Sequence, residues 1–148
     1  MYVVMGSLLS AGAQAAPVCQ EPMAVARAFH DATVEGDFLQ PPVALVSAAF
    51  ASATRAERAC QQREEGICTL DFDPWLDGQD GDIDSAATYA WRARSPASGE
   101  VEVRFTVWGE PHLTRLPMVR QGEGCWQVDD VITHRGQSVR AVLAQPVP

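Results

Sequence analysis

The clearest pattern in the chain is an alternation of apolar and polar residues in its second half. Odd-numbered positions of residues 101–107 are apolar, and the positions between them are charged or Thr, as in a strand with one buried face. The same period runs over residues 87–94, and residues 113–120 and 125–132 form two further segments separated by Gly-containing turns. We therefore expect four antiparallel strands. Pro117 predicts that the third strand lies at a sheet edge or carries a bulge.

The first half of the chain has a helical period instead. Apolar residues recur at helical spacing over residues 22–34, which begin with a proline and are followed by the helix-stopping Gly36. A second, Ala-rich helix is expected over residues 42–62, with Glu57 among the charged residues on its water-facing side. A short closing helix is expected over residues 138–144. The pattern predicts an α+β domain in which N-terminal helices pack on one face of a curved antiparallel sheet of about four strands.

One segment fits neither period. Leu70–Asp84, here called the acidic segment, reads LDFDPWLDGQDGDID and interleaves six aspartates with large apolar side chains. Asp, Gly and Pro interrupt it too often for a helix or strand, yet it is too apolar for a solvated linker. We interpret it as a structural connection between the helices and the sheet. In this interpretation Trp75 fills the core beside its apolar neighbours, while Gln79 and Asp80 fasten the segment to the body of the domain.

Six aspartates also raise the hypothesis of a calcium site, because calcium prefers several oxygen ligands on a flexible loop. Asp80, Asp82 and Asp84 match the first three ligands of the helix-loop-helix calcium pattern. The glycine required at the sixth position is replaced by Ser85, and the glutamate required at the twelfth by Trp91. The pattern therefore fails, and we expect no metal and no cofactor.

Composition and charge narrow the class of protein. The chain has 148 residues, of which 47% are hydrophobic and 20% charged, as expected for one globular domain, which we place at residues 16–148. Its net charge of −8 argues against a nucleic-acid partner, because binding to phosphate backbones requires clustered cations.

The N-terminus predicts export. Residues 1–15 form an apolar run that ends in small residues, with Ala13 and Ala15 in the positions recognised by signal peptidase, although a basic N-terminal region is missing. The run is too short to span a membrane permanently. We expect cleavage after Ala15 and a periplasmic or secreted protein without a membrane span.

Four cysteines fit an exported protein that contains two disulfides. Three pairings are possible. Cys60 and Cys68 flank a short polar segment and make the simplest pair, which leaves Cys19 to pair with Cys125. A metal site is the competing interpretation, but the chain has no C-x-x-C motif and no His at ligand spacing.

Several segments together resemble one bacterial family. They are D-F-D-P-W-L-D-G-Q-D at 71–80, G-E-P at 109–111, G-x-G-C-W-Q-V-D-D-V at 122–131 and S-V-R-A-V-L at 138–143. In this order they resemble the exported family known as domain of unknown function 3828, whose members look like the cone-shaped nuclear-transport-factor-two-like fold, a cystatin-like arrangement. Gly81 departs from the family pattern, which has an aromatic residue there. The resemblance implies a fold and a compartment but no activity.

An enzymatic function is the less favoured interpretation. The chain has no nucleophile elbow, phosphate-binding loop, dinucleotide fingerprint or zinc-protease motif. Cone-shaped enzymes of the isomerase or dehydratase type use an Asp or His in an apolar pocket, and the candidates here are Asp130, His112 and Tyr89. The structural alternatives are that Asp130 pairs with Arg135 or Arg140 and that His112 is a turn residue.

The favoured interpretation is a non-catalytic binding domain. Its partner is expected to be an envelope or exported protein, including a toxin or hydrolase that the domain neutralises, or a small apolar ligand. Exposed Trp75 and Trp108 are the predicted anchors, because Trp is enriched at binding hot spots. Trp108 falls on the outward side of its strand, where a core residue is not expected. A change in sheet curvature before Gly109 is the alternative explanation.

Overall fold

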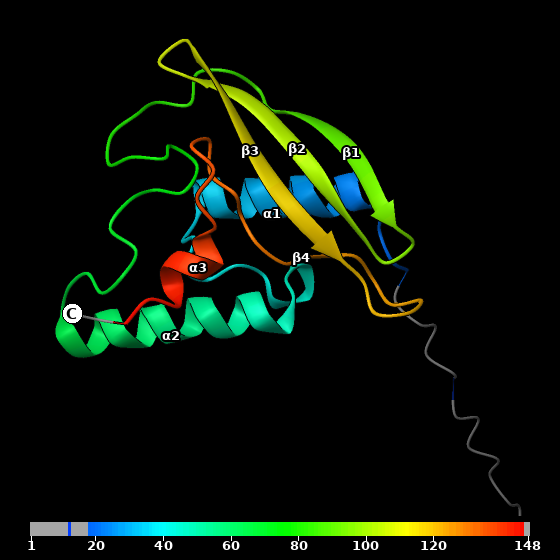
Figure 1. Ribbon diagram of the computed structural model, residues 1–148, viewed down its shortest axis with the longest axis horizontal. Coiled ribbons are helices and arrows are strands. Elements are labelled where there is room, and N and C mark those ends of the chain that lie inside the picture. Colours follow the sequence, from blue (N-terminus) through cyan, green and yellow to red (C-terminus); the bar gives the residue numbers. More distant parts are fainter. Residues whose placement is uncertain (1–11, 13–17, 147–148) are drawn as a thin grey trace, which may run out of the picture.

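The computed structural model describes residues 12 and 18–146, so the predicted signal segment and its cleavage site lie outside the described residues except at residue 12. The chain forms an α+β domain with the helices first, as predicted (Figure 1). The elements in order are α1 (Pro22–Glu35), the 3-10 helix η1 (Val43–Leu45), α2 (Ala48–Glu64), β1 (Thr88–Ser95), β2 (Ser98–Val107), β3 (Glu110–Val119), β4 (Gln127–Val128) and α3 (Val139–Leu143).

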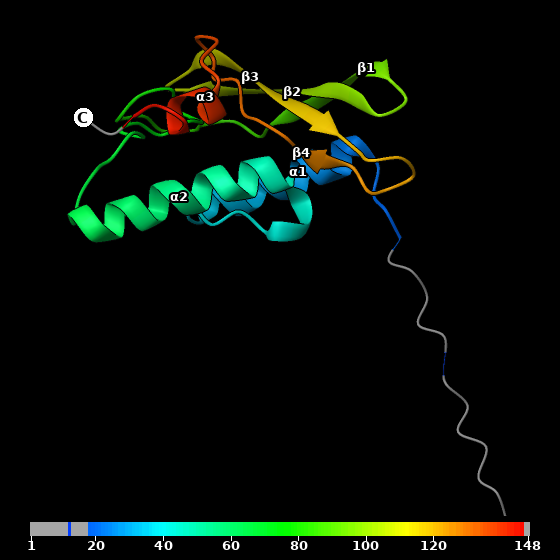
Figure 2. The ribbon, with the colours of Figure 1, turned by 60° about the horizontal axis from the view of Figure 1, so that its bottom comes forward.

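The four strands form a single antiparallel sheet in the order β1-β2-β3-β4. The sheet is curved, and α1 runs along one of its faces (Figure 1). Figure 2 shows α1 and α2 on the same side of the sheet, with α2 farther from it. The opposite face carries the charged residues of the alternating strands, as the period predicted.

The prediction of an edge position or a bulge for the third strand is wrong, because β3 lies between β2 and β4 and pairs with β2 without a bulge. Pro117 fits there because its backbone polar groups face away from β2. Its carbonyl accepts a hydrogen bond from the Asp129 N–H on that side. The nitrogen of a strand residue faces the same side as its carbonyl. The missing N–H of Pro117 therefore faces a side on which β4 contributes only two residues.

Two predicted elements are shorter than expected. The second helix begins at Ala48 instead of Pro42, because the hydroxyl of Ser47 accepts a hydrogen bond from the Phe50 N–H and caps the helix there. The fourth strand contains only Gln127–Val128. Beyond it the register against β3 shifts by one residue, since Asp129 bonds to Pro117 but Ile132 pairs with Arg115.

The core is filled by aromatic side chains between α1 and the sheet. Trp75 is 2% exposed, and its ring centroid lies 6.1 Å from that of Phe29 and 6.3 Å from that of Phe105. The predicted core role of Trp75 is therefore confirmed, and its predicted role as an exposed anchor is wrong. Trp75 Nε1 donates a hydrogen bond to the Thr33 hydroxyl at 3.0 Å, which satisfies its one polar atom.

Both disulfides form as predicted, between Cys19 and Cys125 and between Cys60 and Cys68. The first ties the segment before α1 to the turn between β3 and β4. The second ties the last part of α2 to the residues just before the acidic segment. Among residues 18–146, no helix has both the length and the apolar character needed to cross a membrane.

Candidate functional site

The acidic segment is attached at its beginning by a buried carboxylate. Glu57 of α2 is 3% exposed, so its predicted position on the water-facing side of the helix is wrong. It accepts hydrogen bonds from the backbone N–H groups of Thr69 and Leu70, both at 2.9 Å, and from the Thr69 hydroxyl at 2.6 Å. Burial raises the pKa of Glu57, but these hydrogen bonds outweigh burial, and the pKa lies below its usual value.

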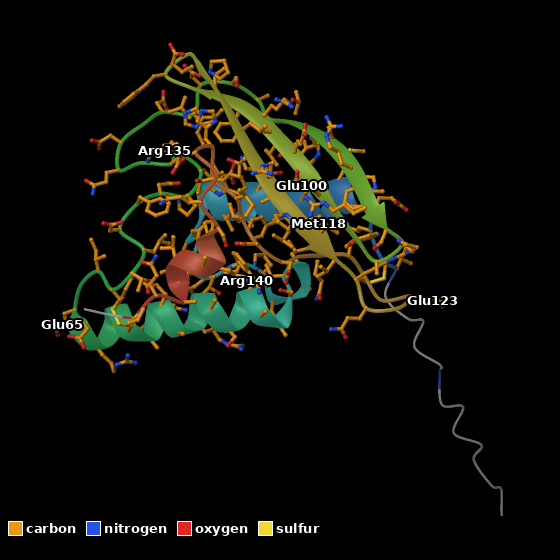
Figure 3. The ribbon with its side chains drawn as sticks, in the orientation of Figure 1. Glu65, Glu100, Met118, Glu123, Arg135 and Arg140 are labelled. Atoms are coloured by element: carbon orange, nitrogen blue, oxygen red, sulfur yellow. A yellow bond between two sulfur atoms is a disulfide. The ribbon has the colours of Figure 1, made fainter. Side chains whose placement is uncertain are left out.

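The middle of the segment is attached by Asp77. Its carboxylate accepts a hydrogen bond from the Arg135 N–H at 2.7 Å and forms an ion pair with the Arg135 guanidinium at 3.2 Å. Figure 3 labels Arg135 on the loop before α3, close to the acidic segment. Burial alone would raise the pKa of Asp77. The hydrogen bonds from Arg135 lower it by more, so the pKa lies below its usual value. This loop and the acidic segment are therefore held together across 58 residues of sequence.

The predicted fastening residues are not the ones that make these contacts. Asp80 is exposed, and within residues 18–146 its side chain makes no hydrogen bond. Gln79 is also exposed and donates one long hydrogen bond, 3.4 Å, to the Asp71 carbonyl inside the segment. The structural interpretation of the segment holds, but Glu57, Asp77 and Asp84 perform the attachment.

The end of the segment binds the turn between β2 and β3. One carboxylate oxygen of Asp84 accepts a hydrogen bond from the Gly109 N–H at 2.7 Å, and the other accepts one from the Thr106 hydroxyl. The Asp82 carbonyl accepts a hydrogen bond from the Trp108 N–H at 2.9 Å. Trp108 and Gly109, here called the hairpin tip, are thus held by the backbone and a side chain of the acidic segment.

Trp108 is exposed, as predicted. Its exposed fraction is 65%, and its backbone φ is 49°, while Gly109 has φ 76°. Val107 pairs with Glu110, so the hairpin tip is a two-residue turn with two left-handed residues. Such turns match the twist of the flanking strands, but a bulky residue in the first position carries a conformational cost. The turn also explains why Trp108 leaves the strand alternation.

A groove lies beside the hairpin tip at the same end of the sheet. It has a volume of about 480 Å³ and is mostly apolar. Thr106 and Pro111, which flank the hairpin tip in sequence, line it, together with Phe105, Leu113 and His112. Side chains from β2, β3 and the segment before β1 therefore surround one depression next to the exposed Trp108.

The three candidate catalytic residues are not brought into contact with one another. The Tyr89 hydroxyl lies 2.9 Å from His30 Nδ1. His112 is a strand residue, half-buried and stacked on His134 with 4.3 Å between ring centroids, so its interpretation as a turn residue is wrong. Asp130 accepts hydrogen bonds from the N–H groups of Val131 and Arg140 and from the Ser138 hydroxyl, so it is a structural cap for α3.

His30 lies at the edge of the apolar stripe of α1, a position that predicts a half-buried packing residue, and the structure buries it more completely. It is 6% exposed, and its ring packs edge-on against Trp75 with 4.5 Å between centroids. Burial lowers the pKa of His30, and nearby Asp31 offsets only part of that effect. Burial and His134 likewise lower the pKa of His112, against smaller opposing contributions from Asp77 and the Trp75 backbone.

These two histidines predict a loss of stability in mild acid. Because their pKa values are lowered on folding, the unfolded chain binds protons that the folded chain does not. The effect on stability is absent above the pKa of histidine in the unfolded chain, near 6.5. As the pH decreases below that pKa, the free energy of unfolding falls. Each histidine contributes a slope of up to about 1.4 kcal/mol per pH unit.

Chemical denaturation between pH 7.5 and about 5 measures this slope. Replacing His30 with Asn keeps a side-chain nitrogen near Tyr89 but removes the titration, so His30→Asn should have a shallower slope than the wild type. Identical slopes would show that His30 does not contribute.

Comparison of the chain with models of protein families, with curated proteins and with solved structures found no match.

Proposed function

We propose that this protein is an exported, non-catalytic protein-binding domain and that Trp108 is the central anchor of its docking surface. The observation that carries the proposal is an indole exposed to 65% at a left-handed backbone position, held there by Asp84 and the Asp82 carbonyl. The two disulfides and the predicted signal segment support a periplasmic or secreted location.

Folding alone does not favour Trp at this position. A left-handed backbone costs a non-glycine residue roughly 1–2 kcal/mol, and Asn is the usual first residue of such a turn. The exposed indole also gains little from burial within its own chain. A residue that satisfies neither the turn nor the core is expected where binding requires it. Trp is moreover the residue most enriched at binding hot spots.

The surroundings of the hairpin tip define the chemistry of the partner. Two exposed acidic residues adjoin it: Glu110 follows it in the sequence, and the Asp82 carbonyl is bonded to the Trp108 N–H. The apolar groove lies beside it. We therefore infer a partner with an apolar pocket for the indole and basic residues around that pocket. An exported or envelope protein fits the expected compartment, and neutralising a toxin or hydrolase is one role for such a surface.

The other two interpretations receive less support. The space between α1 and the sheet, the interior in which such a fold would enclose a small apolar ligand, is occupied by Trp75, Phe29 and Phe105. An enzyme would need an acid or base that acts with a second group in a pocket. Asp130 is used as a cap and Tyr89 is bonded to His30, while His112 lines the groove but is stacked on His134. The exterior, at the hairpin tip, is the better-supported place for binding.

Replacing Trp108 with Asn separates binding from folding. Asn-Gly is favoured in this turn, so we expect Trp108→Asn to raise the free energy of unfolding by about 0.5–1 kcal/mol. The same variant should recover the partner at least about tenfold less efficiently from an envelope fraction of the producing organism, because a hot-spot residue contributes more than the roughly 1.4 kcal/mol that corresponds to tenfold.

Denaturation and quantitative affinity capture give the two readouts. Val43→Ala is the matched control, because Val43 is 70% exposed but belongs to η1. Its capture should equal that of the wild type. Equal capture by the wild type and Trp108→Asn would remove Trp108 as an anchor.

A further inference from the structure

A second docking feature is the outer edge of β1. This strand has eight residues, is the first in the sheet order, and in the described part of the chain pairs only with β2. The opposite end of the sheet is covered by β4 and by the loop around Ile132, which bonds to Arg115 of β3. β1 therefore presents an unpaired strand edge, which is a template for another strand.

The register identifies the backbone groups at this edge. Thr106 directs its N–H and C=O toward Ser85 and Asp84, on the β1 side of β2. Because the direction alternates along a strand, Arg104, Glu102 and Glu100 also face β1 and bond to their partners in register. These partners are Thr88, Ala90 and Arg92. The intervening Tyr89, Trp91 and Ala93 consequently direct their N–H and C=O groups away from the sheet.

Positive charge surrounds this edge on the outer sheet face. Arg92 and Arg94 have exposed side chains, 65% and 66%, and pair with Glu102 and Glu100. Each glutamate is shared with a second arginine, since Glu102 also pairs with Arg104 and Glu100 with Arg115. Four arginines thus share two carboxylates, and this face is basic although the whole chain has a net charge of −8. Figure 3 labels Glu100 within the sheet.

The side of β1 that faces α1 is aromatic. Tyr89 and Trp91 are half-buried there, and the Arg27 guanidinium of α1 lies 4.6 Å from the centre of the Tyr89 ring. Trp91 packs against Trp126 with 5.0 Å between ring centroids. An added strand would therefore meet arginines on one face and aromatic rings on the other.

We propose that β1 accepts an extended segment of a partner protein as a fifth strand and that this segment alternates acidic and apolar side chains. The backbone groups of Tyr89, Trp91 and Ala93 would bond to it. Its acidic side chains would lie beside Arg92 and Arg94, and its apolar side chains beside Tyr89 and Trp91. This inference deepens the proposed function and rests on it, because the groove beside the hairpin tip contains Thr88, where β1 begins.

A second copy of this chain is the less suitable occupant. Pairing two β1 strands would place the arginines of one copy beside those of the other, and like charges across neighbouring strands are destabilising. Arg92 and Arg94 thus oppose self-association while favouring an acidic strand.

The test uses the full chain and two fluorescently labelled peptides, one of alternating glutamate and valine and one of alternating lysine and valine. Fluorescence anisotropy should give a Kd below about 1 mM for the acidic peptide and at least about tenfold weaker binding for the basic one. Ala93→Pro should weaken binding of the acidic peptide at least about tenfold, because it blocks the edge without removing a bond to β2. Arg92→Gln should reduce the preference of the protein for the acidic peptide over the basic peptide.

Three results of the peptide assay would overturn the inference. They are the absence of acidic-peptide binding by the wild type, equal binding of the two peptides, and unchanged binding by an Ala93→Pro variant that melts like the wild type. If Ala93→Pro does not fold, the Arg92→Gln variant tests the inference instead. An unchanged preference for the acidic peptide in that variant would overturn it. Sedimentation gives a separate test. A wild-type dimer that becomes tighter in Arg92→Gln would show that the edge pairs with a second copy, and this would also overturn the inference.

The peptide assay does not depend on the hairpin tip. Loss of peptide binding with intact Trp108-dependent capture of a partner therefore overturns only the role of β1. Peptide binding without Trp108-dependent capture overturns only the role of Trp108.

Discussion

Replacing Trp75 with Ala is expected to lower the free energy of unfolding by about 3–5 kcal/mol, which would unfold a large fraction of a domain of ordinary stability. Trp75 is fully buried between α1 and the sheet, against Phe29, His30 and Phe105. Removing the indole leaves a large cavity among rings that cannot collapse into it, and it also leaves the Thr33 hydroxyl without the Trp75 Nε1 donor.

Urea denaturation of the wild type and Trp75→Ala measures this loss. Trp108→Ala is the matched control, since it removes the same side chain from an exposed position. The control should change the free energy of unfolding by less than about 1 kcal/mol. Similar losses in both variants would contradict the central position of Trp75 in the core.

The second large effect is expected at Glu57. Glu57→Ala leaves the Thr69 and Leu70 N–H groups and the Thr69 hydroxyl without their acceptor, and we expect a loss of about 2–4 kcal/mol at pH 7. Glu57→Gln should lose much less, because the amide oxygen can accept from both N–H groups while the amide nitrogen donates to the Thr69 oxygen.

Denaturation at pH 7 and in acid measures both variants. Because the pKa of Glu57 is lowered on folding, its stabilising charge is fully present above the usual Glu value and is lost as the pH falls through the folded value. The difference between the wild type and Glu57→Gln should therefore shrink below about pH 4. Glu64→Ala, at the exposed end of the same helix, is the control and should be close to neutral. A Glu57→Ala variant as stable as this control would show that the acidic segment does not need its attachment to α2.

Local sequence patterns predicted the helices, strands and disulfides that short stretches of sequence determine. The two periods located α1 and the first three strands, and the spacing of Cys60 and Cys68 predicted both disulfides. The position of β3 inside the sheet was not predictable from Pro117 alone. A proline is accepted wherever its nitrogen faces an unpaired side, and that depends on how far β4 extends.

The sequence predicted that aspartates of the acidic segment attach it to the domain, but not which aspartates make the contacts. The aspartates of the acidic segment look alike in sequence, but only the Asp77 carboxylate bonds to Arg135 and only the Asp84 carboxylate bonds to the hairpin tip, across 58 and 25 residues. Contacts at that separation have no local signal. Trp108 had one, because Trp-Gly between two alternating segments is the position of a two-residue hairpin turn.

We propose that the acidic segment holds Trp108 outward for a protein partner. Incorporating a photo-crosslinking aromatic amino acid at position 108 tests it directly, with position 43, which is also exposed, as the control. After irradiation in an envelope fraction, we predict a discrete adduct at position 108 that is absent at position 43 and is suppressed by an excess of wild-type protein. Identical adducts from both positions, or no adduct from position 108, would contradict the claim.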